Sequence, residues 1–592
     1  MKPEERYHSV RLPEQPIQLD GNDNGGLGFT ISPGILSLFT IVFFIIYIPG
    51  LLVDVMDVDA AQYASMSREM VETGNWLELH NRYHDYLDKP PLLFWLSSSS
   101  MWLFGISNFA YKLPSFFFGI LAVFSTIRLT ELIYNRVTAA MAGLMVASCL
   151  GFFIMMNDVR TDTILMGSFA FSLWQLLLYV KTKSWRALIL GFTGIGLAML
   201  SKGPLGLVMP AFALSCEFAY KRQWVNFVRW QWLAGLVVVG ILLTPMCIGL
   251  YNQFDAHPEK TVHGQTGVSG IEFYFWTQSF GRITGDSDWG TKFDNGATNF
   301  FFTHTFMWAF FPWSILTVLG LAKNLFMLVR SKFRPGYLHE MLATGGFILI
   351  FLALSASKYK LPHYIYITFP LAAIIAARFL IADMLQPARK IMSGFGIAFS
   401  TLFTVLLFTV AGIILFIVFP GPPVLTVLIV FLLAVSAIAF FFIRKTKAER
   451  MVLPLLAGLM AFYYTGFTHF YPELLRYQCT NEVGRDVVAA NVPRDAFYLH
   501  NEVFQHSLDF YSRGAPAYIG LDSAFVMPVI KKHGEIWIYT DEPGYEEILK
   551  SGFNMSTVKE YKYFGVQFLT FEFLNPETRA EKLRNMYLVK LQ

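Results

Sequence analysis

The polar side chains best suited to chemistry stand in one stretch, from Asp54 to Pro91, directly after the first long apolar segment. This stretch holds the following charged residues: Asp54, Asp57, Asp59, Arg68, Glu69, Glu72, Glu78, Arg82, Asp85, Asp88 and Lys89. A chain this apolar has little reason to gather so many carboxylates beside its first span unless they are functional. A carboxylate takes the proton of an attacking hydroxyl, and an ammonium holds phosphate oxygens. The stretch is therefore predicted to be a catalytic loop.

If the catalytic loop transfers a group to a hydroxyl, the expected donor of that group is a lipid-linked sugar. The loops predicted to face outward contain neither GxxxxGK[ST] nor GxGxxG, the patterns that cradle nucleotide phosphates. A sugar on a polyprenyl phosphate has an apolar tail for a groove between spans. Its phosphate needs cations at the membrane surface, where Lys and Arg bind phosphate oxygens.

The composition of the chain predicts a membrane protein. Its 592 residues are 54% hydrophobic and 15% charged, whereas soluble domains carry about a quarter charged residues. The net charge of +4, with no long basic cluster, gives no indication of nucleic-acid binding. The four cysteines form no CxxC pair, so neither a disulfide framework nor a zinc knuckle is indicated. Residues 1–33 are polar without a cleavable signal and are expected to be a cytoplasmic tail.

Thirteen apolar runs have the length of a transmembrane helix. They are 34–53, 112–133, 138–156, 162–181, 186–201, 204–220, 230–251, 304–329, 341–356, 363–383, 392–418, 424–443 and 451–471. Basic residues at alternate turns place those turns in the cytoplasm and loops 54–110 and 252–303 outside. The short segment 92–107 is expected to lie at the interface, and a crossing there would reverse the orientation of the N-terminus.

A second domain is predicted beyond residue 472, where charged residues return. Strands are expected at Ala496–Leu499, Glu535–Tyr539 and Gly565–Phe571, and helices at Tyr545–Ser551 and Asn575–Tyr587. The prediction is therefore a transmembrane domain over 34–471, followed by an extracytoplasmic α/β domain over 472–592.

The outward motifs carry a family resemblance. Asp57–Ala64 (DVDAAQYA), Arg68–Met70, Gly74–Trp76 and Tyr86–Leu92 (YLDKPPL) resemble the first periplasmic loop of the bacterial aminoarabinose transferase (ArnT)-like and protein O-mannosyltransferase-like (PMT) family. The resemblance continues through Arg160–Asp162, Ser201–Pro204, Arg282 and Ser357–Tyr364, and covers about residues 35–380. It implies a polytopic α-helical membrane protein of the GT-C type. The implied activity moves a sugar from undecaprenyl phosphate to lipid A, another glycan or a protein hydroxyl, at the periplasmic face of a bacterial inner membrane.

The resemblance also implies site residues. The catalytic candidates are Asp59, as the base for the acceptor hydroxyl, and Asp162. The candidates for binding the donor phosphate are Lys89, Lys202, Arg282 and Lys360. The candidates for binding substrate are Asp57, Tyr63, Tyr86, Asp88, Arg160, Tyr359 and His363. Structural alternatives stand beside these roles: Asp59 as a helix cap, Lys89 as an interfacial lysine, and Arg160 with Asp162 as a local ion pair.

Departures from the family pattern leave the metal and the substrate open. Gln62 and Ala60 replace an arginine and a glutamate of the aminoarabinose enzymes, and Trp276–Gln278 replaces a Glu-His pair that helps to bind a divalent metal. No cofactor is assigned, and a metal is doubtful even with His257, His263 and His304 in the region. Two other functions remain as alternatives: a transporter or flippase of a lipid-linked or polar solute, and a non-catalytic assembly or sensor protein. A transporter typically carries ionisable residues at mid-membrane and repeated halves, which this sequence lacks.

Overall fold

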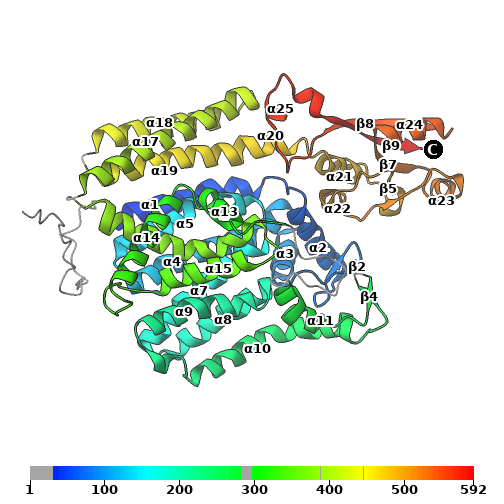
Figure 1. Cartoon of the computed structure of the whole chain (residues 1–592). Helices are drawn as coiled ribbons and strands as arrows, with labels where there is room; N and C mark the ends of the chain where they lie inside the picture. The colour runs from blue at the N-terminus through cyan, green and yellow to red at the C-terminus, as the bar shows by residue number, and fades with distance from the viewer. Residues whose placement is uncertain (1–30, 263, 282–295, 387–388, 445) are drawn as a thin grey trace, which may run out of the picture.

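The structure, a computed structural model, describes residues 31–262, 264–281, 296–386, 389–444 and 446–592. A bundle of long helices carries a smaller α/β unit at one end (Figure 1). The helical elements of the bundle are α1 Pro33–Tyr47, η1 Ile48–Leu51, α4 Asn108–Ile133, α5 Arg136–Ser148, α6 Leu150–Asn157, α7 Thr161–Thr182, α8 Trp185–Lys202, α9 Leu205–Tyr220, η2 Trp224–Asn226, α10 Gln231–Leu250, η3 Tyr251–Asp255, α13 Phe301–Ala309, α14 Ser314–Arg330, α15 Leu342–Ala356, η5 Pro362–Thr368, α16 Phe369–Phe379, η6 Leu380–Met384, α17 Lys390–Ile413, η7 Ile414–Val418, α18 Val424–Ile443, α19 Lys447–Thr465, η8 Gly466–Phe470 and α20 Tyr471–Leu475.

The described helices confirm a polytopic membrane protein. Eight of them are long and apolar enough to cross a bilayer, and a ninth span results if the bent pair α5 and α6 is one span. Each of the thirteen predicted apolar runs coincides with a helix or a broken helix. Two runs are broken: one bends by 54° between α5 and α6, and 304–329 is interrupted between α13 and α14, where Pro312 lies. The count of thirteen spans stays a prediction.

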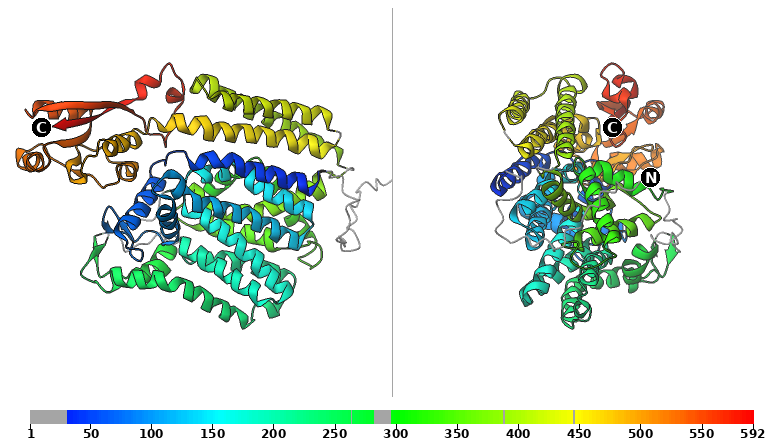
Figure 2. Two further views of the ribbon diagram at one scale, coloured as in Figure 1. Left: turned by 180° about the vertical axis from the view of Figure 1, so that it is seen from behind. Right: turned by 60° about the vertical axis from the view of Figure 1, so that its left-hand side comes forward.

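The predicted catalytic loop folds at the end of the bundle that carries the α/β unit (Figures 1 and 2). It contains α2 (Asp59–Thr73) and a short hairpin of β1 (His80–Asn81) and β2 (His84–Asp85), and α3 (Leu92–Phe104) follows it. Beside it lie β3 (Thr261–Val262), β4 (Gln265–Thr266), α11 (Gly270–Glu272) and the π-helical segment η4 (Phe273–Gly281). The loops 54–110 and 252–303 therefore meet at one end of the bundle in their described parts.

The C-terminal unit is built on a mixed five-stranded sheet of order β6-β5-β7-β9-β8. Strands β6, β5 and β7 are parallel, and β9 runs antiparallel to both β7 and β8. The elements are α21 Thr480–Ala489, η9 Arg494–Ala496, β5 Phe497–Leu499, α22 His506–Ser512, β6 Ala517–Tyr518, α23 Ser523–His533, β7 Ile536–Asp541, α24 Glu542–Lys550, β8 Met555–Tyr563, α25 Phe571–Leu574, η10 Arg579–Lys582 and β9 Arg584–Leu591.

Two predictions for this unit are wrong. Residues 565–571 form a connection and the first residue of α25 rather than a strand, because Val566 is buried against the ends of the bundle helices instead of pairing in the sheet. The segment 575–587, predicted as a helix, holds only the short η10 before β9 begins at Arg584. Met586 and Leu588 of β9 are buried in the core of the unit, which favours the strand.

The C-terminal unit packs on the catalytic loop. Arg68 of α2 donates from Nη2 to the carbonyl of Gly514 at 3.2 Å, and Arg82 donates from Nη2 to the carbonyl of Pro516 at 2.6 Å. The Asp54 carboxylate forms an ion pair with Arg485 of α21. Hydrogen bonds to charged donors are roughly twice as strong as neutral ones, so the unit holds the loop in place.

Candidate functional site

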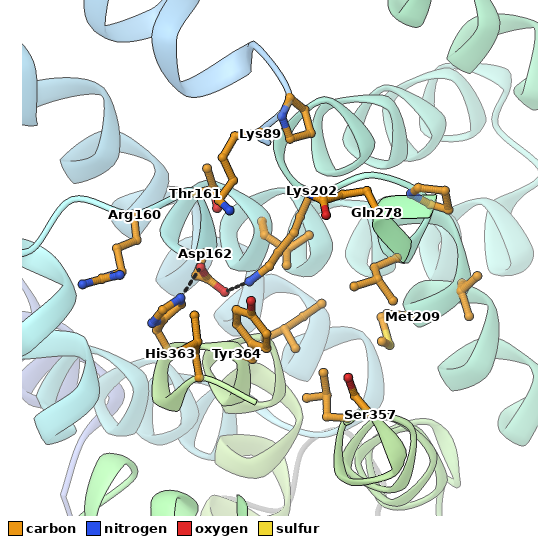
Figure 3. A pocket seen from close by; sticks show the side chains of 18 of the residues that line it. Lys89, Arg160, Thr161, Asp162, Lys202, Met209, Gln278, Ser357, His363 and Tyr364 are labelled. Atoms are coloured by element: carbon orange, nitrogen blue, oxygen red, sulfur yellow. Dashed lines mark hydrogen bonds and ion pairs between the residues drawn. The ribbon is translucent and has the colours of Figure 1, made fainter. Parts of the chain in front are cut away.

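A cavity of about 310 Å³ opens where the catalytic loop meets the bundle (Figure 3). One end is charged and polar, lined by Asp59, Tyr63, Lys89, Arg160, Asp162, Lys202, Gln278 and His363. The other end is apolar and is lined mainly by α9 and α15, including Leu205, Val208, Met209, Phe212, Ala353 and Leu354. The cavity therefore fits a molecule with a charged head and an apolar tail.

Asp59 and Arg160, which both line this cavity, form an ion pair. Asp59 is the first residue of α2, whose N-cap residue Val58 makes no side-chain capping bond. Arg160 precedes α7, and its Nε donates to Asp158 at 2.6 Å. Arg160 thus joins two carboxylates and fixes the direction of the Asp59 side chain. The geometry does not support the alternative that Asp59 caps the helix, because Val58 is the N-cap residue and the Asp59 carboxylate pairs with Arg160.

A second charged group lies deeper in the cavity. Asp162, in the first turn of α7, forms an ion pair with Lys202 at the end of α8, and its other oxygen lies 3.7 Å from Nε2 of His363. Only 4% of the Asp162 side chain is exposed. The Lys202 ammonium also lies 3.7 Å from the centroid of the Tyr364 ring. Figure 3 shows these side chains converging from three elements.

A sharp turn after α8 brings Lys202 to this position. Gly203 ends the helix with a φ of +74°, a backbone conformation that favours glycine. Gly206 lets α9 pack closely on α8, since a Cβ atom there would lie 2.4 Å from the amide nitrogen of Met199. The hydroxyl of Ser201 donates to the carbonyl of Thr161 at 2.7 Å and ties the end of α8 to the start of α7. The SKGP motif therefore positions the ammonium against Asp162.

Lys89 completes the polar end from the catalytic loop. Its Nζ lies 2.5 Å from Oδ2 of Asp88. Gln278, from η4, donates from Nε2 to Oδ1 of Asp88 at 3.0 Å and also to the Asp88 carbonyl. Asp88 thus holds Lys89 on one side and Gln278 on the other. Gln278 ties the described part of loop 252–303 to the catalytic loop.

Comparisons with known proteins bear on the fold of the chain. The family profile of dolichyl-phosphate-mannose-protein mannosyltransferase matches residues 88–248. The structure superposes on a crystal structure of ArnT from Cupriavidus metallidurans bound to undecaprenyl phosphate, with a TM-score of 0.67 and 18% identity, over 94% of this chain and 98% of that one. The chain has an ArnT-like GT-C fold. The expected family resemblance is thereby confirmed.

Curated relatives agree at the level of sequence. The chain is 26% identical to the undecaprenyl phosphate-alpha-4-amino-4-deoxy-L-arabinose arabinosyl transferase of Shewanella sediminis over 386 residues, which are 63% of this chain and 64% of the relative. It is 25% identical to the protein of the same name from Serratia proteamaculans over 350 residues, 58% of each chain. The chain spans less than two thirds of the length of these relatives in the alignments.

The ArnT-like fold brings most of the predicted site residues into the cavity. Seven of them line it: Asp59, Tyr63, Lys89, Arg160, Asp162, Lys202 and His363. Tyr86 and Asp88 line a small adjoining hollow of about 20 Å³ that Lys89 and Gln278 also border. Sequence reasoning did not assign Gln278 or Tyr364 to the site. The YKLPHY segment was the signal available for Tyr364, whereas Gln278 stood out only as a departure from the family pattern.

Three predicted substrate or phosphate contacts lie outside the cavity lining. Lys360 is buried and donates to the carbonyl of Ala297 at 3.2 Å. The Tyr359 carbonyl accepts a hydrogen bond from Ser357 at 3.1 Å. Asp57 is buried where the catalytic loop meets the C-terminal unit, and its carboxylate accepts a hydrogen bond from the Ser507 amide at 3.0 Å. Arg282 and His263 lie outside the described residues.

No metal site was assigned from the sequence. Within the part of the chain that the structure describes, no three His, Cys, Asp or Glu side chains are grouped to hold a metal ion. The ring of His257 lies instead 3.0 Å from the carboxylate of Glu259 at an exposed position.

Gln278 gives a direct test of the polar end. In Gln278→Ala, Asp88 loses both hydrogen bonds from the Gln278 amide, and we expect kcat/KM of the activity proposed below to fall about tenfold, the effect of a hydrogen bond of roughly 1–1.5 kcal/mol. In Gln278→Glu, two carboxyl groups face each other, so activity should rise as the pH is lowered and one of them takes a proton. A pH profile of the two variants checks this. Identical profiles for both variants would contradict the contact.

The buried contact beneath Asp57 predicts a pH-dependent stability. Burial raises the pKa of Asp57 to about 7, although the hydrogen bond from Ser507 acts to lower it. Burial likewise raises the pKa of Asp509 in α22 to about 7, although Arg82 lies 3.7 Å away. The folded protein therefore keeps protons between pH 4 and 7 that the unfolded chain releases, so stability falls as the pH rises through 7.

Asp509→Asn should remove part of this loss of stability at high pH, because an amide carries no charge to be buried. Neither oxygen of Asp509 accepts a hydrogen bond from a described residue, and the side chain is fully buried. We expect a higher unfolding temperature at pH 8, a smaller gain at pH 5 and little change below pH 4, with a gain of a few kcal/mol at most, since one pKa unit is about 1.4 kcal/mol. The exposed Asp495, paired with Lys532, offers Asp495→Asn as a control with a small effect. A lower melting temperature of Asp509→Asn at pH 8 would mean that attraction to Arg82 dominates.

Proposed function

We propose that this protein is a membrane glycosyltransferase that moves a sugar from a polyprenyl phosphate, such as undecaprenyl phosphate, to an acceptor hydroxyl. The observation that carries the proposal is the cavity with a charged head region and an apolar tail region. The fold supports it, because a related ArnT structure has been solved with undecaprenyl phosphate bound. Relatives named as aminoarabinose transferases support the same class of donor.

Each charged group has a place in the proposed reaction. The acceptor oxygen attacks the anomeric carbon, the bond from that carbon to the phosphate oxygen breaks, and the phosphate leaves on its lipid. Asp59 takes the proton of the acceptor hydroxyl. Lys89 and Lys202 hold the phosphate oxygens and stabilise the charge that develops on the leaving group.

Asp162 is better suited to positioning than to proton transfer. Both of its oxygens face cationic or protonatable groups, Lys202 on one side and His363 on the other. The Asp59 side chain is 39% exposed at the cavity, whereas that of Asp162 is 4% exposed. An acceptor hydroxyl can therefore reach Asp59 more readily.

The proposed topology keeps the thirteen predicted spans, with the active site and residues 472–592 on the periplasmic side of an inner membrane. The tail 1–33 would be cytoplasmic, and 34–471 the transmembrane catalytic domain. The common position of the catalytic loop and the C-terminal unit at one end of the bundle supports this arrangement (Figure 2). Labelling single cysteines near residues 75 and 540 with an impermeant reagent tests it, and both should react from the same side.

The activity test uses the full chain in lipid nanodiscs with a panel of polyprenyl-phosphate sugars. Lipid A, other glycans and peptides are offered as acceptors, and mass spectrometry follows loss of the lipid-linked sugar. Transfer to one acceptor, with free polyprenyl phosphate as the other product, is the expected result. Movement of an intact lipid-linked sugar across a liposome membrane without cleavage would support the alternative of a flippase instead.

A further inference from the structure

Three large apolar side chains are exposed together on the C-terminal unit. Phe568, Leu569 and Phe571 are 81%, 42% and 90% exposed. They belong to the connection 564–574, which follows β8 and includes α25. We call this connection the aromatic loop. Contiguous exposed apolar side chains of this kind mark a surface that contacts another apolar phase or a partner.

The buried side of the aromatic loop is packed on the end of the helix bundle. Val566 and Phe573 are 3% and 0% exposed and share a core cluster with Val418 and Phe419. The rings of Phe564 and Phe573 stack with centroids 3.8 Å apart. One set of side chains therefore faces the bundle, while the exposed set faces away from the protein.

Arg579 fixes the aromatic loop to the bundle. Its Nε donates to the Phe573 carbonyl at 2.9 Å, and its Nη2 donates to the carbonyl of Val418. The guanidinium carbon lies 4.7 Å from the centroid of the Phe419 ring. Val418 is the last residue of a candidate span, so Arg579 holds the loop at the level where that span ends.

The exposed side chains are continuous with the apolar surface of the spans. The α17–η7 span ends at Val418, and the α18 span begins at Val424. Neighbouring residues of these spans, Ile417 and Val424, are 58% and 84% exposed, as side chains that face lipid must be. Figure 1 shows the aromatic loop and α25 beside the ends of α18 and α20. Phe and Leu side chains are typical of the apolar face of segments that lie in the membrane interface.

We propose that the aromatic loop inserts Phe568, Leu569 and Phe571 into the adjacent lipid leaflet. The partner is a phospholipid surface, because the patch lies at the edge of the lipid-facing surface and continues it. Burial of these side chains in the interface removes apolar area from water. The bilayer contact then adds to the contacts that the C-terminal unit makes with the catalytic loop and, through Arg579, with the end of the bundle. The contact is independent of the proposed glycosyl transfer.

Spin labels in the full chain test this contact. In a background where the half-buried Cys216 and Cys247 are replaced by serine, Phe568→Cys and Phe571→Cys are labelled singly and placed in phosphatidylcholine nanodiscs. The matched control is Phe525→Cys on α23, 63% exposed at the far end of the same unit. Accessibility is measured to oxygen, which concentrates in lipid, and to a water-soluble nickel chelate.

Labels at 568 and 571 should favour oxygen several-fold over nickel, and the label at 525 should favour nickel. Nickel accessibility at 568 and 571 equal to that at 525 would overturn the proposal. Dipolar broadening between two labels at 568 within one disc would assign the patch to a second copy of the chain, which also overturns it. Because all three sites are exposed, circular dichroism should be unchanged for each variant and confirms that the fold is retained.

Discussion

Asp59→Asn is expected to lower the rate of sugar transfer by about 10²- to 10⁴-fold, the usual contribution of a positioned general base. The amide cannot accept the proton of the acceptor hydroxyl. Its carbonyl oxygen can still accept a hydrogen bond from Arg160, which also keeps its contact with Asp158 at 2.6 Å. The fold and the binding of the donor should therefore persist. The measurement is single-turnover transfer, together with the affinity for polyprenyl phosphate.

Asp54→Asn is the matched control for Asp59→Asn. Asp54 lies five residues earlier in the same stretch and also pairs with an arginine, Arg485, but it does not line the cavity. Its replacement should leave the chemical step unchanged. Full activity of Asp59→Asn would remove Asp59 as the base. An equal loss in both variants would mean that Asp59 acts only by holding the loop against its neighbours.

The bundle was largely predictable because a bilayer-length apolar run has few alternatives to a helix. What the runs did not reveal is where they break. The break at Cys149 had only a weak local signal, because Ser148 and Gly151 stand beside it in an otherwise apolar run. The break before α14 had a local signal in Pro312. The strand β8 was missed because its charged residues, among them Lys559, Glu560 and Lys562, hide the alternation of a strand.

The site was predictable where its residues stand in local motifs. Asp59, Lys89 and Asp162 were assigned from short patterns, and the fold brings them to one cavity. Contacts between distant segments could not be read in this way. Gln278 bonds to Asp88 across 190 positions, and Ser507 bonds to Asp57 across 450. The two aspartates of residues 57–59 therefore lie in different places. Asp59 lines the cavity, whereas Asp57 joins the catalytic loop to the C-terminal unit.

Lys89→Met is expected to weaken binding of the donor by about 10- to 100-fold, since a hydrogen bond to a charged group contributes about 1.5–3 kcal/mol. The methionine fills a similar volume without the ammonium, and Asp88 is left with Gln278 as a donor. The effect should appear in the KM for the polyprenyl-phosphate sugar and in the Kd for polyprenyl phosphate. The chemical step should change less.

Two further variants separate phosphate binding from an interfacial role of this lysine. Lys260→Met removes an ammonium that pairs with Asp85 at 3.0 Å outside the cavity, so the KM should stay unchanged. Lys89→Arg keeps the charge but replaces a compact ammonium by a planar fork. A lysine that merely reaches the headgroups would tolerate Arg completely, because either cation satisfies that role. A phosphate contact within the confined head region requires a defined position, so Lys89→Arg should recover only part of the lost affinity.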